Sequence, residues 1–480
     1  MRYKVGVDRK QELFLPPSLD EYVAGNHICR FIEAFTEQLD MVALEFKYAT
    51  SKETGCRSYD PRMMLKLYIY GYLHRVRSSR RLEDETRRNV EVMWLMEGLT
   101  PDDKTICNFR RENAKELKEA FKAFVKLGRE FGMYGGEVVA TDSVKVRANN
   151  SLDNNHNATT VENALSKIDK KIEEYLKLLD ENDKAEKKEE RPRAVQIEAA
   201  LAGLKKRKEK YEGLKKRLEE GETEVSTVDP DARLMRNGGE GRKLDVSYNV
   251  QTVVDSKYHL VAAYEVSTCA NDTGNLKPLS DEVKEILQVQ QLTNLADSGY
   301  YYSEDIVDCE RSGVTCLVAK PATGGPKKEE GFNRKDFVYD KEKDVYVCPE
   351  QNELSYKSTR EHVSGREYLV YSSATTCKNC AKKSVCTKAD HREVLRLTCQ
   401  DTLDVVDERT KSNKGLYRKR QEIVEHCFGT VKAVWGYRQF LCRKKVKVSG
   451  EMALTYIAYN MRRIFNIFAE SGRKMAVGIR

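Results

Sequence analysis

Two aspartates stand where carboxylates can act together. Asp142 follows the short apolar run at residues 138–140 and Thr141, and Asp297 follows a second apolar run at residues 292–296. An aspartate inside an apolar strand costs several kcal/mol unless a cation or hydrogen bonds compensate its charge. Either aspartate alone is more commonly a strand-end residue that caps a loop. Two carboxylates at the carboxyl ends of neighbouring strands would instead converge on one point, where they can hold divalent cations.

A third acidic residue, Glu425, lies in a segment whose apolar residues have helical spacing. On a helix, Glu422, Glu425 and Lys432 lie close to one face. One surface then carries an acid flanked by basic residues, which suits a metal-binding carboxylate beside the phosphates of DNA. A salt-bridged surface helix is the alternative, and it is the better interpretation of this segment alone. The packed side of the helix is formed by Ile423, Val424, Phe428 and Val431.

The segments around the two aspartates predict a mixed α/β sheet. Apolar runs and alternating patterns predict strands at residues 138–146, 244–254, 260–266, 292–296 and 315–319, and helices at 275–288 and 303–311. Three strands in a meander followed by alternating helices and strands are typical of such a sheet. We assign residues 136–320 and 390–470 to this core, and helical spacing returns at residues 414–468.

Residues 1–135 are predicted to form a helical domain. Apolar residues cover nearly every face of segment 61–71, and a second helical run covers 82–96 after a group of arginines. Helices joined by short basic turns are typical of small DNA-binding bundles, while an ordinary bundle with solvated arginines is the alternative. The clustering favours DNA, with Arg80 and Arg81 as candidate contacts. The cluster comprises Arg75, Arg77, Arg80, Arg81, Arg87, Arg88, Arg110 and Arg111.

Two insertions interrupt the predicted core, and the first is helical. Between residues 158 and 222, apolar residues step by threes and fours on both sides of Arg191-Pro192-Arg193. This pattern predicts a helical hairpin of coiled-coil character. Its many charged residues are more typical of a solvated face than of a DNA-binding surface.

The second insertion, residues 321–389, contains a cysteine cluster within sequence rich in glycine, lysine and turn residues. Cys348, Cys377, Cys380 and Cys386 follow the spacing C-x28-C-x2-C-x5-C. Four thiolates can close a tetrahedral structural zinc site, and a segment with little apolar content would need such a clip to fold. Reduced structural thiols are the alternative, because the last spacing is five residues rather than two.

Length and composition limit the class of protein. A chain of 480 residues favours several domains rather than one core. It carries 84 Lys and Arg against 76 Asp and Glu, and the net charge of +8 permits a polyanionic partner without requiring one. No stretch approaches the roughly 18 apolar residues of a membrane helix, and the N-terminus lacks the apolar core of a signal peptide. Most of the 13 cysteines stand singly, so we expect a soluble cytoplasmic protein with reduced thiols.

The three acids resemble the catalytic triad of the DDE transposases of bacterial insertion sequences. Asp142 on the first strand, Asp297 in an Asp-x-Gly-Tyr turn after the fourth strand, and the helical Glu425 occur in the order of that triad. The resemblance extends over most of the chain. It includes Tyr59-Asp60-Pro61, Asn108-Phe109-Arg110 and Asp229-Pro230-Asp231-Ala232.

One group of this family has the signature Y-(2)-R-(3)-E-(6)-K, which is similar to Tyr417, Arg420, Glu425 and Lys432. The match departs at one point, because four residues separate Arg420 from Glu425 and Gln421 stands at the strict arginine position. Glu422 follows Arg418 with the required spacing, but Gly429 then stands where the lysine belongs. We therefore assign the third acid to Glu425.

The resemblance implies an RNase H-like catalytic domain that binds double-stranded DNA at the terminal inverted repeats of an element and at its target. It also implies two Mg²⁺ or Mn²⁺ ions, with Asp142 bridging both and Asp297 and Glu425 each holding one. Tyr417 and Lys432 would contact the DNA backbone near the cleaved phosphate. Pairing of two ends implies a homodimer, associated with the bacterial nucleoid, and the predicted hairpin offers a surface for it.

Two other classes of protein fit parts of the sequence. A catalytically silent DNA-binding protein derived from a transposase would be expected to lose acids, whereas all three are present. An RNase H-like nuclease acting on RNA or on DNA junctions would share the core. The basic helical N-terminal region and the long insertions fit end-specific DNA binding better than that second alternative.

Overall fold

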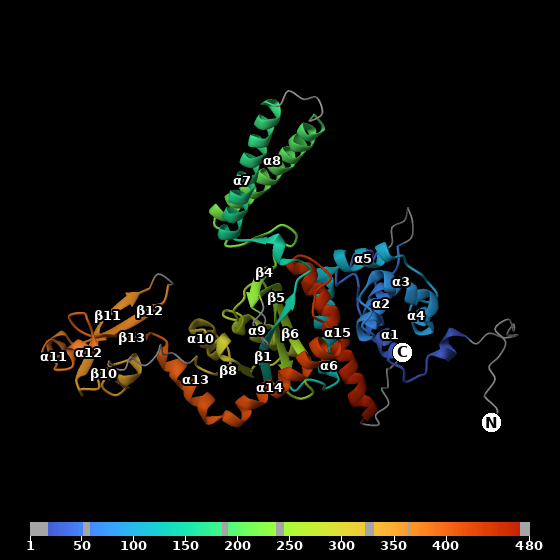
Figure 1. The fold of residues 1–480 in the computed structure, drawn as a ribbon. Helices are drawn as coiled ribbons and strands as arrows, with labels where there is room; N and C mark the ends of the chain where they lie inside the picture. Colours follow the sequence, from blue (N-terminus) through green and yellow to red (C-terminus); the bar gives the residue numbers. More distant parts are fainter. Residues whose placement is uncertain are drawn as a thin grey trace, which may run out of the picture. The chain divides into compact units, whose positions relative to one another are not determined.

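The computed structural model describes residues 18–50, 58–184, 191–236, 244–321, 331–362 and 365–470 (Figure 1). The chain divides into two compact units. The first unit comprises Met1–Gly135, Ser143–Asn271 and Glu425–Arg480, and the second comprises Gly136–Asp142 and Asp272–Val424. A helical N-terminal region and mixed sheets confirm the predicted mixed α/β class. None of the described helices is both long and apolar enough to cross a membrane.

Capping residues divide the N-terminal part of the first unit into short helices. Asp60 begins α2 by accepting a hydrogen bond from the Arg62 N–H at 2.7 Å, and Pro61 takes the first helical position. The single helix predicted over residues 82–96 is wrong. Asn89, with φ −108° and ψ 114°, ends α3 and caps α4 by accepting the Glu91 N–H at 3.0 Å. The elements are η1 (Leu19–Tyr22), α1 (Ile28–Glu37), α2 (Pro61–Leu73), α3 (Ser79–Arg88), α4 (Val90–Leu95), α5 (Asp103–Glu112) and α6 (Ala114–Glu130).

Helix α15 (Lys445–Glu470) is the central helix of the first unit. It packs against α2, α6 and the strand β6 (Val261–Ser267), and every residue from 450 to 461 is buried. The helical segment predicted at residues 414–468 is interrupted, because α14 (Lys414–Phe428) passes into a π-helical turn, η6 (Gly429–Val434). A new helix then begins where Asp229 accepts the Lys444 N–H at 3.0 Å and Asp231 accepts the Lys445 N–H at 2.8 Å.

Gly450 lies where α15 approaches the start of α6 most tightly. A Cβ at this position would lie 2.7 Å from the backbone oxygen of Ala114 and 2.8 Å from its Cα, so no side-chain rotation could relieve the clash. We expect Gly450→Ala to destabilise the first unit by about 1–3 kcal/mol, measured as a lower melting temperature. Gly213→Ala is the control, since nothing lies within 4 Å of that position in α8 (Arg191–Glu219). Equal melting temperatures for the two variants would contradict the close approach.

A six-stranded sheet has the strand order β4-β5-β1-β7-β8, with β6 also paired to β5. In the first unit, β4 and β6 each run antiparallel to β5. In the second unit, β1 runs parallel to β7, and β7 runs parallel to β8. The strands are β1 (Val138–Arg147), β4 (Arg233–Arg236), β5 (Leu244–Asp255), β7 (Leu292–Ala296) and β8 (Val314–Val318).

Helices cover the parallel strands of the second unit. Helix α10 (Ser303–Arg311) supplies the crossover that the parallel strands β7 and β8 require. Helix α9 (Leu276–Leu287) contacts β7 and α10, and α13 (Gln400–Ser412) contacts β8 and α10. The core between them is formed by Leu276, Ala296, Tyr300, Ile306, Cys309, Val314, Cys316, Val318, Leu403 and Val406.

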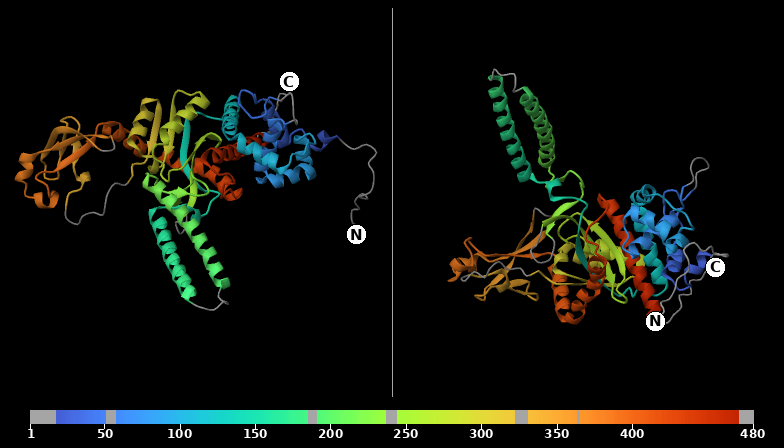
Figure 2. Two further views of the ribbon diagram at one scale, coloured as in Figure 1. Left: turned by 90° about the horizontal axis from the view of Figure 1, so that it is seen from above. Right: turned by 45° about the vertical axis from the view of Figure 1, so that its right-hand side comes forward.

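Two long helices, α7 (Ala158–Lys184) and α8, lie over the segment for which the sequence predicts a hairpin, and they run side by side in Figures 1 and 2. At their base, Val161 and Leu214 pack with Val225. Farther along, Lys208 Nζ lies 2.8 Å from Asp169 Oδ1 across the pair, so charges here serve helix pairing. The base also holds η2 (Leu152–Asn154) and the paired short strands β2 (Asn155–His156) and β3 (Val225–Ser226).

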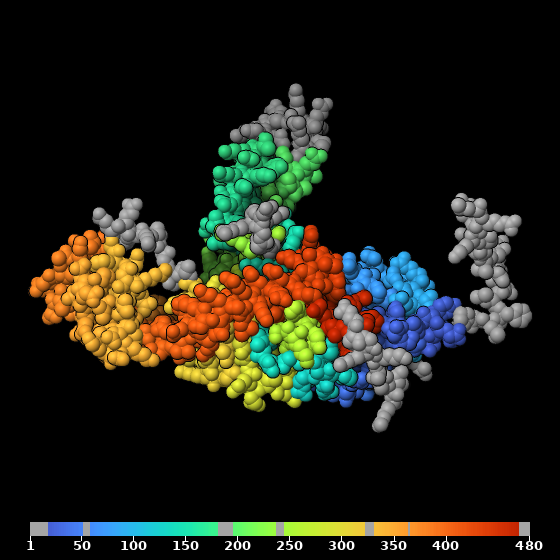
Figure 3. All heavy atoms as spheres, turned by 90° about the horizontal axis from the view of Figure 1, so that it is seen from below, coloured from blue at the N-terminus to red at the C-terminus, as the bar shows by residue number. Residues whose placement is uncertain are grey.

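The cysteine-rich insertion of the second unit contains an antiparallel sheet of its own, with strand order β13-β12-β11-β10-β9. The sequence predicts no strands there, because in β11 only Leu354 is buried and the alternating apolar signal is missing. The space-filling view shows the insertion as one compact group of side chains (Figure 3). Its elements are η5 (Arg334–Asp336), β9 (Val338–Asp340), β10 (Val345–Val347), β11 (Glu353–Glu361), β12 (Glu367–Ser372), α11 (Ala374–Lys378), α12 (Lys383–Cys386) and β13 (Glu393–Leu397).

Candidate active site

The pairing of β1 with β7 brings Asp142 and Asp297 together. The two strands run parallel, with Thr141 directly opposite Ala296. Asp142 is the next residue of β1, and Asp297 directly follows the last residue of β7. Neighbouring strands are about 4.8 Å apart, and residues at matching positions project to the same face. Two carboxylates therefore stand side by side at one edge of the second unit's sheet.

A buried hydrogen-bond chain fixes this register. The Thr141 hydroxyl donates to Asn294 Oδ1 at 2.8 Å, and Asn294 Nδ2 donates to Ser280 Oγ on α9 at 2.9 Å. The Ser280 hydroxyl in turn donates to the backbone oxygen of Leu276 at 2.7 Å. A slip of one residue between β1 and β7 would break this chain and turn the two carboxylates to opposite faces. Sequence reasoning did not single out these polar residues.

The turn after β7 orients Asp297. Its Oδ1 accepts the N–H of Gly299 at 2.8 Å and caps the 3-10 helix η4 (Ser298–Tyr300). Tyr300 is fully buried in the core below the turn. The Asp-x-Gly-Tyr motif thus combines a half-buried carboxylate, a close turn and an aromatic anchor.

A fourth carboxylate, that of Asp272, borders the same turn. A Cβ on Gly299 would lie 3.0 Å from Asp297 Oδ1 and 3.1 Å from Asp272 Oδ2, so both carboxylates crowd this backbone. Any side chain here would push at least one of them aside, which explains the glycine. Sequence reasoning missed Asp272, since the turn Asn271-Asp272-Thr273-Gly274 precedes a helix and resembles an ordinary loop.

Helix α14 contributes a basic and an aromatic residue to this edge. Arg420 Nη1 donates to Asp142 Oδ2 at 2.8 Å, and the two side chains are 12% and 28% exposed. Burial raises the pKa of the Tyr417 hydroxyl, the charge of Arg420 lowers this pKa, and the charge of Asp297 raises it. Tyr417 is half-buried one turn before Arg420 on the same helix face. Asp142, Asp297, Tyr417 and Arg420 thus form one cluster.

The remaining predicted residues of the α14 signature belong to the first unit. Glu425 is exposed on α14, five positions after Arg420, and Glu422 is exposed as well. Lys432 is half-buried in the π-helical turn η6, so the regular helix assumed for its spacing to Glu425 does not continue to it. The positions of Glu422 and Glu425 along α14 therefore do not decide which of them is the third acid.

Two parts of the chain match known families. Residues 17–112 match a family model described as a transposase domain, and residues 347–465 match one described as a transposase DDE domain. These two matches support a DDE-class insertion-sequence transposase. No curated protein and no solved structure matches the transposase. Glu425 and Arg420 lie within the second matched range, and Asp142 and Asp297 lie between the two ranges.

The arginine cluster of the transposase's N-terminal helices contains both exposed and buried side chains. Arg81 is exposed, and Arg80 is 86% exposed with its Nε 3.4 Å from Asp103 Oδ2. Arg110 is buried instead, and it donates to the Tyr72 hydroxyl at 3.1 Å and to the backbone oxygen of Arg77 at 3.2 Å. The expectation that the whole cluster faces DNA is therefore wrong for Arg110, which stabilises helix packing. Further members pair with acids: Arg87 with Glu83, Arg88 with Glu85, and Arg111 with Glu112.

Among the described residues of the transposase, one group of three or more metal-ligating side chains has its ligand atoms within 4.8 Å of one another: His27, Cys29 and Glu91. His27 Nδ1 accepts the Cys29 N–H at 3.3 Å, so the neutral ring carries its proton on Nε2, which faces Glu91 Oε1 at 3.5 Å. A metal on Nε2 would need a ring without either proton. Burial also raises the pKa of the Cys29 thiol to about 12. This group is better explained as a hydrogen-bonded cap of α1.

Proposed function

We propose that the transposase cuts DNA at the ends of its element and joins the freed ends to target DNA, with Asp142, Asp297 and Glu425 as catalytic carboxylates. The observation that carries the proposal is the side-by-side placement of Asp142 and Asp297 by the β1–β7 register. The Thr141–Asn294 contact supports it, because it ties this placement to the core. The strand order β6-β5-β1-β7-β8, antiparallel and then parallel, agrees with an RNase H-like catalytic domain.

The carboxylates suit divalent cations. Mg²⁺ and Mn²⁺ prefer oxygen ligands from one or two carboxylates, water and substrate phosphate. Two ions at such a site polarise the attacking and the leaving oxygens of an in-line displacement at phosphorus. The Arg420 guanidinium stands beside Asp142 at 2.8 Å, which marks this edge as one that attracts positive charge. Asp142, Asp297 and Glu425 would hold the ions, and Asp272, which borders the same turn as Asp297, would assist Asp297.

The chain's own residues position the DNA. In hydrolysis a water oxygen bonds to phosphorus as the bond from phosphorus to the 3′ oxygen breaks; the water loses a proton and the 3′ oxygen gains one. In strand transfer the freed 3′-hydroxyl takes the place of water. Arg420 can exchange Asp142 for a phosphate oxygen, since guanidinium groups bind both anions in the same geometry. Tyr417 and Lys432 would hold neighbouring phosphates.

We also propose Arg80 and Arg81 as DNA contacts. We further propose a homodimer that pairs two element ends, with the α7–α8 hairpin as the candidate dimer surface.

A catalytically silent DNA-binding protein is the alternative function. The test is cleavage of duplexes that carry the inverted repeats flanking the coding region, with Mg²⁺ or Mn²⁺ and with a chelator in parallel. We expect cutting at the repeat ends that the chelator abolishes. Binding to the repeats without any cutting by the intact protein would favour the silent alternative.

The same assay assigns the third acid. Glu425→Ala should abolish metal-dependent cutting while binding to the repeats persists, because the missing carboxylate removes a metal ligand. Glu422→Ala is the matched control, an equally exposed glutamate on the same helix, and it should cut at a rate close to that of the unmodified protein. If Glu425→Ala cuts and Glu422→Ala does not, the third acid is Glu422.

A further inference from the structure

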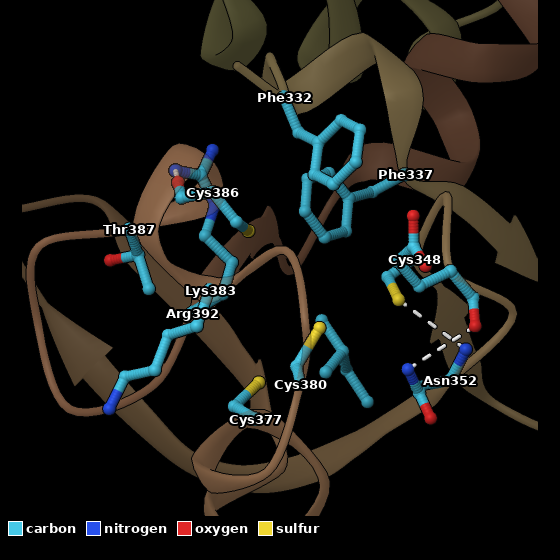
Figure 4. Close-up of a pocket in the computed structure, with 12 residues that line it drawn as sticks. Phe332, Phe337, Cys348, Asn352, Cys377, Cys380, Lys383, Cys386, Thr387 and Arg392 are labelled. Atoms are coloured by element: carbon cyan, nitrogen blue, oxygen red, sulfur yellow. Dashed lines mark hydrogen bonds between the residues drawn. The ribbon is translucent and has the colours of Figure 1, made fainter. Parts of the chain in front are cut away.

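Four cysteines of the second unit line one small pocket that DNA cleavage does not use (Figure 4). Cys348 comes from the turn after β10, Cys377 from α11, Cys380 from the turn after α11, and Cys386 from the last residue of α12. They are the four cysteines of the described insertion, and all are half-buried and reduced. Figure 4 shows their sulfur atoms around a common space that Phe332 and Phe337 border on one side.

The turn that carries Cys348 is prepared for a thiolate. The Cys348 N–H donates to the backbone oxygen of Asn352 at 2.9 Å, and the backbone oxygen of Cys348 accepts the Gln351 N–H at 2.8 Å. These bonds close a tight turn in which Gln351 adopts the left-handed region at φ 58°. The Asn352 N–H points at Cys348 Sγ, 3.4 Å away. A hydrogen bond to sulfur stabilises its charged form. Such backbone contacts orient and tune thiolate ligands of metals.

The insertion has a small buried core. Its buried cluster contains only five residues, against which Cys348, Cys377 and Cys386 pack. Small folds with so few buried apolar side chains generally need a disulfide or a metal ion. No disulfide is present among the described cysteines. The five residues are Phe337, Tyr346, Leu354, Tyr371 and Val394.

The charges around the pocket suit a divalent cation bound by four thiolates, because such a complex is an anion. A divalent cation with four thiolates carries a net negative charge, and Lys383 and Arg392 both line the pocket, against the single carboxylate Glu350. Arg392 also donates to the backbone oxygen of Cys386 at 3.4 Å, which holds its guanidinium beside the site.

We propose that Cys348, Cys377, Cys380 and Cys386 bind one structural Zn²⁺ that closes the insertion. No three of these sulfur atoms lie within 4.8 Å of one another in the described structure. Zinc–sulfur bonds of about 2.3 Å therefore require these sulfur atoms to come closer together when the ion binds. The ion has no open position for water, and it stabilises the fold of the insertion without taking part in cleavage.

The test is the metal content of the full-length protein, purified without chelator. We expect about one zinc per chain, and less than about half an equivalent would overturn the proposal. Exchange with Co²⁺ should give the intense visible bands of a tetrahedral thiolate site. A different spectrum, an iron content that replaces zinc, or a Cys377–Cys380 disulfide found by thiol titration would each overturn it. These readouts do not depend on cleavage activity, so they stand apart from the proposed function.

Two variants locate the ion. Cys380→Ser should lose the zinc, and proteases should then cut within residues 331–397. Cys269→Ser is the matched control, an exposed cysteine outside the insertion, and it should keep one zinc and the protease resistance of the unmodified protein. If Cys380→Ser does not fold, the metal content and the cobalt spectrum of the unmodified protein still decide whether the insertion binds zinc. Zinc retained in folded Cys380→Ser would overturn the assignment of the ligands.

Discussion

Replacing Asp142 or Asp297 with asparagine should reduce metal-dependent cutting of element ends by about 10³-fold or more. Each change removes one negative charge from the proposed site, which would have to balance two divalent cations, and metal ions contribute several kcal/mol to such displacements, at about 1.4 kcal/mol for each tenfold in rate. Asparagine keeps the size of the side chain and one acceptor oxygen. The hydrogen bond from Gly299 to residue 297 can therefore persist, and the fold should be retained.

The measurement is the single-turnover cleavage rate with Mn²⁺, together with DNA binding by gel shift and the melting temperature. Asp308→Asn is the matched control, because Asp308 is an exposed aspartate on α10 of the same unit, 3.5 Å from Arg311. It should cut like the unmodified protein. Full cleavage by either Asp142→Asn or Asp297→Asn would remove that residue from the catalytic set, whereas loss of both cleavage and binding would indicate a folding defect.

Where the local sequence pattern determines an element, the sequence was sufficient to predict that element. The apolar runs before Asp142 and Asp297 predict β1 and β7, because a short apolar stretch that ends in a polar turn is typical of a buried parallel strand. The predicted bounds of α10 and β7 coincide with those of the structure. Once both apolar runs are assigned to neighbouring strands, the acids that follow them can be predicted to lie close together, and the β1–β7 register agrees with this although β1 continues past Asp142 to Arg147.

Where contacts between distant residues decide, the sequence was not sufficient. Thr141 and Asn294 are 153 positions apart, and nothing local marks them as the pair that sets the register. Asp272 reaches the site from a loop with no periodic pattern. Arg110 resembles its exposed neighbours in type, but the bundle buries it. Charge and turn type are visible in a sequence, whereas burial of a polar residue depends on the assembled fold.

Replacing Arg420 should have the second large effect. The structure pairs Arg420 with Asp142, a contact that the residue spacing on α14 did not predict. Its guanidinium contacts Asp142 at 2.8 Å, so in the proposed mechanism it would compete with a metal ion for the same carboxylate. If Arg420 moves to a DNA phosphate during cleavage, it acts after metal binding. Arg420→Ala should then lower the cleavage rate by about 10–100-fold, because a hydrogen bond to a charged group contributes about 1.5–3 kcal/mol, at about 1.4 kcal/mol for each tenfold in rate.

The same variant should not lose metal binding, and this separates its role from that of the carboxylates. Without DNA, Mn²⁺ should raise the melting temperature of Arg420→Ala at least as much as that of the unmodified protein, since the competing charge is gone. Asp142→Asn should show a much smaller rise. Arg420→Lys should recover part of the cleavage, because lysine keeps the charge and loses the two-pronged geometry. A loss of the Mn²⁺ effect in Arg420→Ala would instead mean that Arg420 orients Asp142 for the metal, and that the two do not compete.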